Sequence, residues 1–186
     1  MRKRTGSLVL AVWLLSVSAR ADDHLGDACG SGSYNRASNL FGWHAALTIP
    51  LGRHLKPGET PPPIQANFVY ETGKSSGDHV EGEVKGTLSQ KTHLAGFRWT
   101  FTRKKHKHFL PFSQFLFGRV NREGVGLDAK LWGFAVGGGT DYIPHRPNSS
   151  RIAIGLRGQA DYVFVPAAIS VRLYPRVTAG VFLRLE

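Results

Sequence analysis

Apolar and polar residues alternate along most of this chain with a period of two, the repeat of a β-strand whose two faces meet different surroundings. The clearest case is the segment 41–51, where Phe41, Trp43, Ala45, Leu47, Ile49 and Leu51 share one face. The same alternation recurs in residues 65–70, 92–102, 110–120, 132–142, 152–162 and 178–186. No segment keeps a helical period for long, so the pattern predicts an all-β protein.

The last segment alternates almost to the chain end, with Val181, Leu183 and Leu185 on one face and Gly180, Phe182 and Arg184 on the other. A terminal strand with an uncovered edge invites aggregation. Pairing the last strand with the first covers that edge and closes a barrel. An even-numbered barrel needs an eighth strand, and residues 28–36 are the best candidate, although they are rich in Gly and Ser and poor in apolar residues.

The N-terminal segment 1–21 predicts a secretory signal peptide. It joins a basic start (Arg2, Lys3, Arg4) to an apolar run at 8–17 and the small residues Ala19 and Ala21. The apolar run is shorter than the ~20 residues that a spanning helix needs, which disfavours the alternative of an N-terminal anchor. We expect cleavage after Ala21 and a single domain over residues 22–186.

Composition narrows the class of protein further. Without residues 1–21, 20 of the 24 basic residues remain against 13 acidic ones, a net charge of +7. No second apolar run of helix-spanning length follows, so a helical membrane protein is excluded while a barrel is not. Cys29 is the single cysteine, so no internal disulfide is possible. Its distance from the apolar run favours a partly buried thiol over a lipid anchor. Export together with alternating strands predicts an outer-membrane barrel.

Three consecutive motifs carry a family resemblance. They are WGFAVGGGTDY at 132–142, RGQADY at 157–162 and RVTAGVFLR at 176–184. Together they resemble the small OmpA-like, porin-like outer-membrane β-barrel proteins, over roughly residues 40–186. The resemblance implies an eight-stranded antiparallel up-and-down transmembrane β-barrel in the outer membrane of a Gram-negative bacterium. Members are mostly non-enzymatic.

The closing strand is similar to the terminal signal that the outer-membrane assembly machinery recognises in this family. Gly180, Leu183 and Leu185 match that pattern, whereas Leu185 and Glu186 stand where the family usually has a terminal aromatic residue. The resemblance therefore implies as partners this machinery together with outer-membrane lipids and lipopolysaccharide. It implies a monomer and no nucleic-acid partner.

Strand order with a periplasmic C-terminus predicts which connections face outward. Residues 72–91, 121–129 and 164–174 become outer loops, and 52–63, 103–109 and 143–150 become inner turns. The longest predicted loop, 72–91, then faces outside, as barrels usually arrange it. Surface contact is expected through 72–91 and 121–129.

Side chains fill the interior of a barrel of this size, and strand parity predicts which polar groups point inward. These are Arg98, Gln114, Asp141, Arg157, Gln159, Asp161 and Arg184. Buried charges are costly unless they are paired and hydrogen-bonded. We expect Asp141 to lie near Arg184 at one rim, and Arg157 to share a face with Asp161. The favoured hypothesis is a structural ion network that plugs the lumen, and the alternative is a proton or ion pathway.

Glycines and aromatic residues fit this arrangement. The alternate small residues Gly133, Ala135, Gly137 and Gly139 are expected to make room for Arg157 and its neighbours. They are not a phosphate loop, because no Lys-Ser/Thr pair and no helix follow them.

The aromatic residues expected to form girdles at the two membrane interfaces are Phe41, Trp43, Trp99, Phe101, Phe115, Phe117, Trp132, Tyr142 and Tyr162.

Other candidate chemistry is weaker. The basic run 103–108 lacks the signature of a nucleic-acid-binding fold, and its His106 and His108 lack a third metal ligand. A solvated turn whose lysines meet anionic headgroups is favoured there. Lipid-A hydrolysis would need His93 with Ser89, or His79 with Glu81 and Glu83, and that family's motif is absent.

The sequence thus predicts a non-enzymatic outer-membrane barrel with a structural, membrane-stabilising or surface-contact role. We expect no cofactor and no bound metal. Three alternatives stay open: a narrow porin that passes small solutes, a lipid-A-modifying barrel enzyme, and a soluble periplasmic ligand-binding barrel. A soluble barrel would need a polar outer face.

Overall fold

The structure is a computed structural model, and it describes residues 26–35, 39–52, 62–81, 84–102, 108–124, 127–144, 152–166 and 171–185. The predicted signal segment 1–21, most of the basic run 103–108 and the inner turn 143–150 beyond residue 144 lie outside the described residues. In the described part of the chain, no helix is long and apolar enough to cross a membrane.

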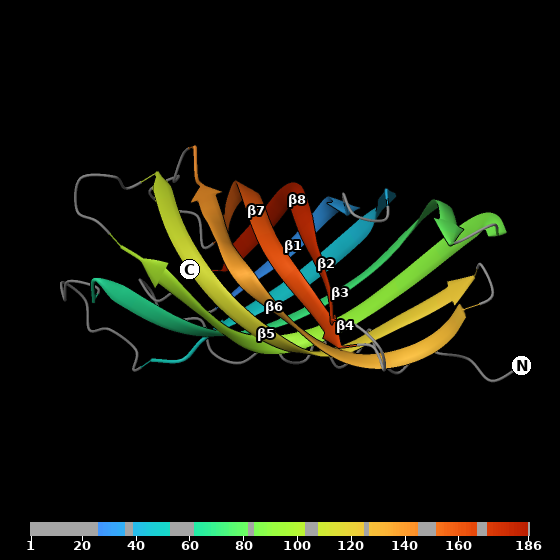
Figure 1. Cartoon of the computed structure of the whole chain (residues 1–186). Helices are drawn as coiled ribbons and strands as arrows, with labels where there is room; N and C mark the ends of the chain where they lie inside the picture. Colours follow the sequence, from blue (N-terminus) through green and yellow to red (C-terminus); the bar gives the residue numbers. More distant parts are fainter. Residues whose placement is uncertain are drawn as a thin grey trace, which may run out of the picture.

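Eight antiparallel strands close into one barrel in simple sequence order (Figure 1). Their bounds are β1 Gly26–Asn35, β2 Leu40–Pro50, β3 Ile64–Glu81, β4 Val84–Phe101, β5 Phe109–Gly124, β6 Leu127–Tyr142, β7 Ile152–Pro166 and β8 Val171–Leu185. Each strand pairs with the next one, and β8 pairs with β1. This up-and-down closure confirms the predicted fold class.

Strand β1, the weakest sequence prediction, closes the barrel. It begins two residues before the predicted start at 28 and pairs with β8 from Gly26 opposite Leu185 to Asn35 opposite Arg176. Its outward positions include Ala28, Gly30 and Gly32, whereas its inward positions are mostly polar. A strand with small residues outside and polar residues inside has no apolar stripe, which explains its weak signal in the sequence.

The outer face of the barrel is apolar, and the interior is largely polar. Exposed large apolar side chains on the outer face include Phe41, Trp43, Ile49, Phe68, Phe97, Trp99, Phe115, Phe117, Trp132, Ile154, Leu156, Tyr162, Val181 and Leu183. All nine predicted girdle aromatics lie on this face, with Phe101 and Tyr142 half-buried. Apolar outside and polar inside is the arrangement of a barrel immersed in lipid.

The strands run further than the sequence pattern indicated. Strand β3 pairs with β4 up to Glu81 opposite Val84, so the predicted outer loop 72–91 is wrong and this segment is a long hairpin. The predicted outer loops 121–129 and 164–174 are wrong for the same reason, because β5–β6 and β7–β8 extend through most of them. Both faces are polar along 72–91 over many positions, so the apolar half of the alternation disappears although the strand continues.

The end of the barrel that holds Gly26 and Leu185 is called the inner end here, and the opposite end the outer end. Connections at the outer end, such as 82–83 and 125–126, are shorter than those at the inner end, such as 51–63. This is the reverse of the usual asymmetry. The polar parts of the hairpins β3–β4 and β5–β6 take the place of long outer loops.

Apolar side chains also fill part of the interior, in two clusters. One lies toward the outer end and contains Val69, Leu94, Leu116, Val120, Ala135, Val163, Val165 and Tyr174. The other lies toward the inner end and contains Cys29, Ala46, Leu110, Ile143, Ala153 and Phe182. The thiol of Cys29 is free and buried, as the sequence indicated. Polar groups between these clusters are therefore shielded from water.

Candidate functional site: the polar lumen

The seven residues that parity placed inside the barrel are all buried in its lumen, each with 5% or less of its surface exposed. They fall into two groups. Asp141, Arg157 and Arg184 join Asp27 near the inner end, and these four residues are called the inner cluster. The other four join Glu71, His44 and Arg176 further out, and this set is called the central network: Arg98, Gln114, Gln159, Asp161, Glu71, His44 and Arg176.

Salt bridges hold the inner cluster together. Arg157 stands opposite Asp141 in the β6–β7 register and binds its carboxylate with two hydrogen bonds, Nε to Oδ1 at 2.7 Å and Nη2 to Oδ2 at 2.9 Å. Arg184 donates to the same Oδ2 at 3.0 Å. Asp27 lies 2.9 Å from Nη1 of Arg157 and 3.8 Å from Nη2 of Arg184. Two carboxylates thus meet two guanidinium groups, and the cluster is electrically neutral.

Aromatic rings support these guanidinium groups. Arg157 lies over Phe182 at 5.1 Å and over Phe112 at 5.6 Å, and Arg98 lies over Phe112 at 4.2 Å. Such cation–π contacts are stronger when both partners are desolvated. The small residues of β6 make room for this arrangement, because a Cβ at Gly139 would meet the Phe112 ring.

The lean face of β6 also accommodates a carboxylate. A Cβ at Gly137 would collide with the side chain of Asp161. The small residues of β6 thus leave room for Phe112, on which Arg157 stacks, and for Asp161.

Glu71 is the hub of the central network. It is fully buried and accepts hydrogen bonds at Oε1 from Gln114 Nε2 (3.0 Å) and Gln159 Nε2 (3.1 Å). At Oε2 it accepts from His44 Nε2 (3.0 Å) and Arg176 Nη2 (2.8 Å). Since the carboxylate can only accept, Nε2 of His44 carries a proton. The sequence interpretation missed Glu71 because the predicted strand ended at residue 70.

Two glutamines connect the cations to the carboxylates. Oε1 of Gln114 accepts from Nε and Nη2 of Arg98 at 3.0 and 2.7 Å, and its Nε2 donates to Glu71 and Asp161. Gln159 repeats this role, with its Nε2 donating to Asp161 Oδ2 at 2.7 Å. An amide that accepts from a guanidinium and donates to a carboxylate uses both of its ends.

The expected neighbourhood of Arg157 and Asp161 does not produce an ion pair. Asp161 instead accepts from Arg176 Nη2 at 2.6 Å, while Arg157 turns toward the inner end. Residues four apart on one face of a strand have different cross-strand neighbours. Asp161 stands opposite Arg176 on β8, and Arg157 stands opposite Asp141 on β6.

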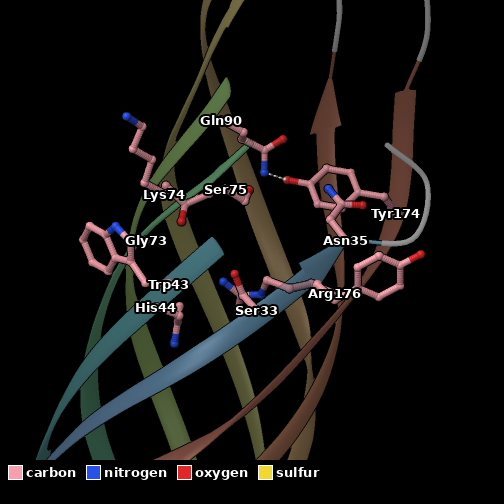
Figure 2. Close-up of a pocket in the computed structure, with 12 residues that line it drawn as sticks. Ser33, Asn35, Trp43, His44, Gly73, Lys74, Ser75, Gln90, Tyr174 and Arg176 are labelled. Carbon is pink, nitrogen blue, oxygen red and sulfur yellow. Dashed lines mark hydrogen bonds between the residues drawn. The ribbon is translucent and has the colours of Figure 1, made fainter. Parts of the chain in front are cut away.

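A third polar group lies at the outer end of the lumen. Nε of Arg122 donates to Gln90 Oε1 at 3.0 Å, and Gln90 Nε2 donates to the hydroxyl of Tyr174 at 2.7 Å. The Arg122 guanidinium also lies 5.3 Å from the centre of the Tyr174 ring. Gln90 and Tyr174 line a cavity of about 20 Å³, whose lining residues come from β1, β2, β3, β4 and β8 (Figure 2). Residues 90, 122 and 174 all lie in the predicted outer loops, so the sequence pattern did not place them in strands.

The buried charges do not cancel over the whole lumen. Five buried arginines face four buried carboxylates, namely Arg98, Arg122, Arg157, Arg176 and Arg184 against Asp27, Glu71, Asp141 and Asp161. Arg122 has no carboxylate partner among the described residues, whereas each of the other four lies within 4 Å of one. Counting arginines and carboxylates, the described lumen therefore carries one surplus positive charge, and that charge lies at the outer end.

The other candidate chemistry does not assemble into a site among the described residues. Nδ1 of His93 lies 3.1 Å from the hydroxyls of Tyr70 and Thr72, while Ser89 is four residues away along β4, about 13 Å at 3.3 Å per residue. The set His79, Glu81 and Glu83 lies outside the described side chains.

No metal-binding group forms within the described ranges either. No cluster of three or more His, Cys, Asp or Glu residues that could hold a metal occurs there. His106 lies outside the described residues, and Nδ1 of His108 contacts the carbonyl oxygen of Ile143 at 2.8 Å.

The three residues of the predicted assembly signal lie on β8. Leu183 faces outward and is exposed, and Leu185 is half-buried at the inner end. Gly180 lies so close to β1 that a Cβ there would collide with Gly30 and Ser31. A glycine at this position therefore has a packing reason within the barrel itself.

No protein-family model and no curated protein sequence matches this chain. Among solved structures it is similar to the Neisserial surface protein A, NspA, with 12% identity, 86% of this chain and 93% of that chain covered, and a TM-score of 0.47. The Yersinia pestis outer membrane protein Ail has 12% identity and a TM-score of 0.46, with 88% of this chain and 100% of that chain covered. The outer membrane enzyme PagL has 10% identity and a TM-score of 0.48, with 86% of this chain and 98% of that chain covered. Identities this low carry no inference about activity.

The closed eight-stranded pairing and the apolar outer face decide the class of protein. The chain is a small outer-membrane β-barrel protein. The predicted fold, an eight-stranded antiparallel up-and-down barrel, is confirmed, and transmembrane barrels of this kind reside in the outer membrane of Gram-negative bacteria.

Proposed function

We propose that this barrel is a non-enzymatic structural protein of the outer membrane whose lumen is closed. The observation that carries the proposal is the central network. Arg98, Gln114 and Gln159 meet near the barrel axis through hydrogen bonds of 2.7 to 3.3 Å, each residue with 4% or less of its surface exposed. Charges that are paired and hydrogen-bonded in this way hold fixed positions rather than lining a water path.

The proton-pathway alternative has less support. A relay would need titratable groups that connect the two ends through exchangeable contacts. Along the described lumen, the apolar clusters around Leu94 and Phe182 flank the polar groups at both ends. Most of the side chains in these clusters carry no exchangeable proton, with Tyr174 and Cys29 as the exceptions among them.

Planar-bilayer conductance tests the closed lumen. We expect the refolded protein, checked for a boiling-dependent gel shift, to give no single-channel steps. Arg98→Ala removes the largest fully buried side chain among the described residues and should allow leakage wherever the barrel still folds. The matched control is Phe97→Ala, which removes an outward side chain from the neighbouring position on β4. Steady steps in the unmodified protein would favour the narrow porin.

An outer-leaflet lipid partner has its own structural support. Four polar residues form a row across the neighbouring strands β3 to β6, namely Lys74, Lys91, Asn121 and Lys130. The strand register places each of them opposite the next. All four point outward. The next outward row toward the inner end includes Arg119 and Trp132, which stack at 5.1 Å. Cations just beyond an aromatic band lie where phosphates of lipopolysaccharide are found.

The lipid contact predicts a selective stabilisation. Lipopolysaccharide should raise the unfolding midpoint of the barrel in mixed micelles, and the triple variant Lys74→Gln, Lys91→Gln, Lys130→Gln should lose most of that increase. Lys85→Gln is the control, since Lys85 points outward from the same strand as Lys91 but further from the aromatic band. Equal losses in the two variants would contradict a defined row.

The remaining expected roles stay predictions. Lipid-A chemistry is disfavoured by the separation of His93 from Ser89, and lipid-A mass spectrometry after expression of the protein checks it. Recognition of Gly180, Leu183 and Leu185 by the assembly machinery, and surface contact through the outer hairpins, are further parts of the proposal.

A further inference from the structure

The outer end of the lumen combines a surplus cation with a small cavity. Arg122 is 4% exposed, and its described partners are neutral, the Gln90 amide and the Tyr174 ring and hydroxyl. A buried charge without a counter-charge is costly. Both neutral partners line the cavity of about 20 Å³, so the surplus charge lies directly behind its wall.

A second arginine in the wall has donors without acceptors. Arg176 lines the cavity and is 5% exposed. Its Nη2 serves both Glu71 and Asp161, but its Nε and Nη1 are buried and meet no acceptor among the described residues. Unmet buried donors of a charged group carry a large desolvation penalty. Two charged N–H groups are therefore available beside the cavity.

The rest of the lining suits an acceptor ligand. Of the side chains around the cavity, those on the interior face are Ser33, Asn35, His44, Ser75, Gln90, Thr92, Tyr174 and Arg176, and the described lining contains no carboxylate. In Figure 2, Ser75, Gln90 and Tyr174 lie above Arg176, and Ser33 lies beside it. Hydroxyl and amide donors around a guanidinium, with no acidic group, form a surface that attracts anions and repels cations.

We propose that this outer mouth binds a small oxyanion group, a phosphate or a sulfate. The enclosed volume holds about one water-sized group. One oxygen of the anion therefore enters beside Arg176 and the Gln90–Tyr174 pair, while its other oxygens lie in the open mouth. Arg122 acts from behind Gln90 and Tyr174 and supplies the charge that the anion balances.

A water molecule alone is the competing occupant. It would accept from the free donors of Arg176, as buried waters commonly do. It would leave the surplus charge of Arg122 in place, because water is neutral. Dependence of binding on Arg122, a residue that does not line the cavity, therefore separates an anion site from a hydration site.

The test follows arginine side-chain NMR signals of the refolded full barrel in an uncharged detergent during titration with inorganic phosphate, at constant ionic strength set with chloride. We expect saturable shifts of the Arg176 and Arg122 Nε–H signals in the millimolar range or below. Arg122→Gln should weaken phosphate binding about tenfold, the size of one charge-assisted interaction. The charge-neutral Ser33→Ala should weaken it less.

Arg119→Gln is the matched control. It removes the same charge from the same strand, three residues away, but from the outward face where Arg119 stacks on Trp132. Binding should not change in this variant. Non-saturable shifts, shifts confined to outward lysines and arginines, or equal losses in the two variants would overturn the proposal, as would an Arg176 signal that never moves.

The source of the anion is decided by a second titration with glucose 6-phosphate. Saturable binding of inorganic phosphate alone assigns the site to a free ion, and binding of both assigns it to a phosphorylated saccharide whose sugar lies in the mouth. Binding of neither overturns the site. None of these outcomes depends on conductance, so the anion site is tested independently of the closed lumen.

Discussion

The inner cluster and the outer end of the lumen solve the same problem, buried arginines, in opposite ways. At the inner end, Arg157 and Arg184 face Asp27 and Asp141, and the strongest contact is the two-pronged pair at 2.7 and 2.9 Å. At the outer end, Arg122 has only neutral partners, and Arg176 leaves two of its nitrogens without acceptors.

The difference indicates which end is structural and which end can bind a ligand. A neutral cluster in which carboxylates and guanidinium groups match has nothing to gain from an additional ion, and any ion that entered would have to break a pair. A region with surplus charge and unmet donors gains from an anion. The central network lies between the two and links them through Glu71 and Asp161.

Glu71→Gln should have the largest effect on this comparison. The change removes the negative charge that Arg176 pairs with and replaces one of the two accepting oxygens by an NH2 donor, so the central network is left with an uncompensated positive charge. Breaking a buried ion pair by removing one partner costs about 3–5 kcal/mol. Urea unfolding in micelles, followed by circular dichroism and gel mobility, measures it.

The control for Glu71→Gln is Glu123→Gln. Glu123 lies 3.6 Å from Lys91, with more than half of its side chain exposed, and an exposed pair of this kind contributes about 0–1 kcal/mol. A loss of similar size in both variants would mean that the central network does not hold the barrel together.

A double-mutant cycle on Asp141 and Arg184 should give the next largest effect. The two groups lie 3.0 Å apart at one rim, so the changes Asp141→Asn and Arg184→Gln should be non-additive, with a coupling of about 1–3 kcal/mol. Asp27 remains available to Arg157 in each variant, which keeps the barrel foldable. Additive effects on the free energy of unfolding would argue against the pairing.

Much of the lumen could be predicted from parity alone, and its partners could not. Period-two alternation fixes which side of a strand a residue occupies, so the burial of Arg98 or Gln159 follows from the sequence. Which residues touch depends on register across strands, and register is invisible without knowing where each strand ends. Arg157 therefore pairs with Asp141 across β6–β7 rather than with Asp161 on its own strand.

The missed residues have two physical reasons. Glu71 and Arg176 lie just beyond the ends of the predicted strands 65–70 and 178–186. Gln90 and Arg122 lie where the strands extend beyond the apolar band, and there the outward face is polar too. When both faces of a strand carry polar residues, the sequence shows no apolar–polar repeat from which the strand could be predicted. The weak first strand shows the same limit, since its outward glycines and inward polar groups hide a strand that pairs fully with β8.

Arg122→Gln should have the smallest effect on stability, and it sharpens the comparison most. In the absence of an anion the variant loses a hydrogen bond to Gln90, worth about 1.5–3 kcal/mol for a charged donor, but it also removes an uncompensated buried charge. These terms oppose each other, and the net change should stay within about 1 kcal/mol, far less than for Arg157→Gln at the inner end. Unfolding midpoints measured with and without phosphate check both halves of the expectation, because phosphate should stabilise the unmodified barrel and not the variant. A loss as large as that of Arg157→Gln would show that Arg122 is as tightly paired as its inner counterparts, and the contrast between the two ends would disappear.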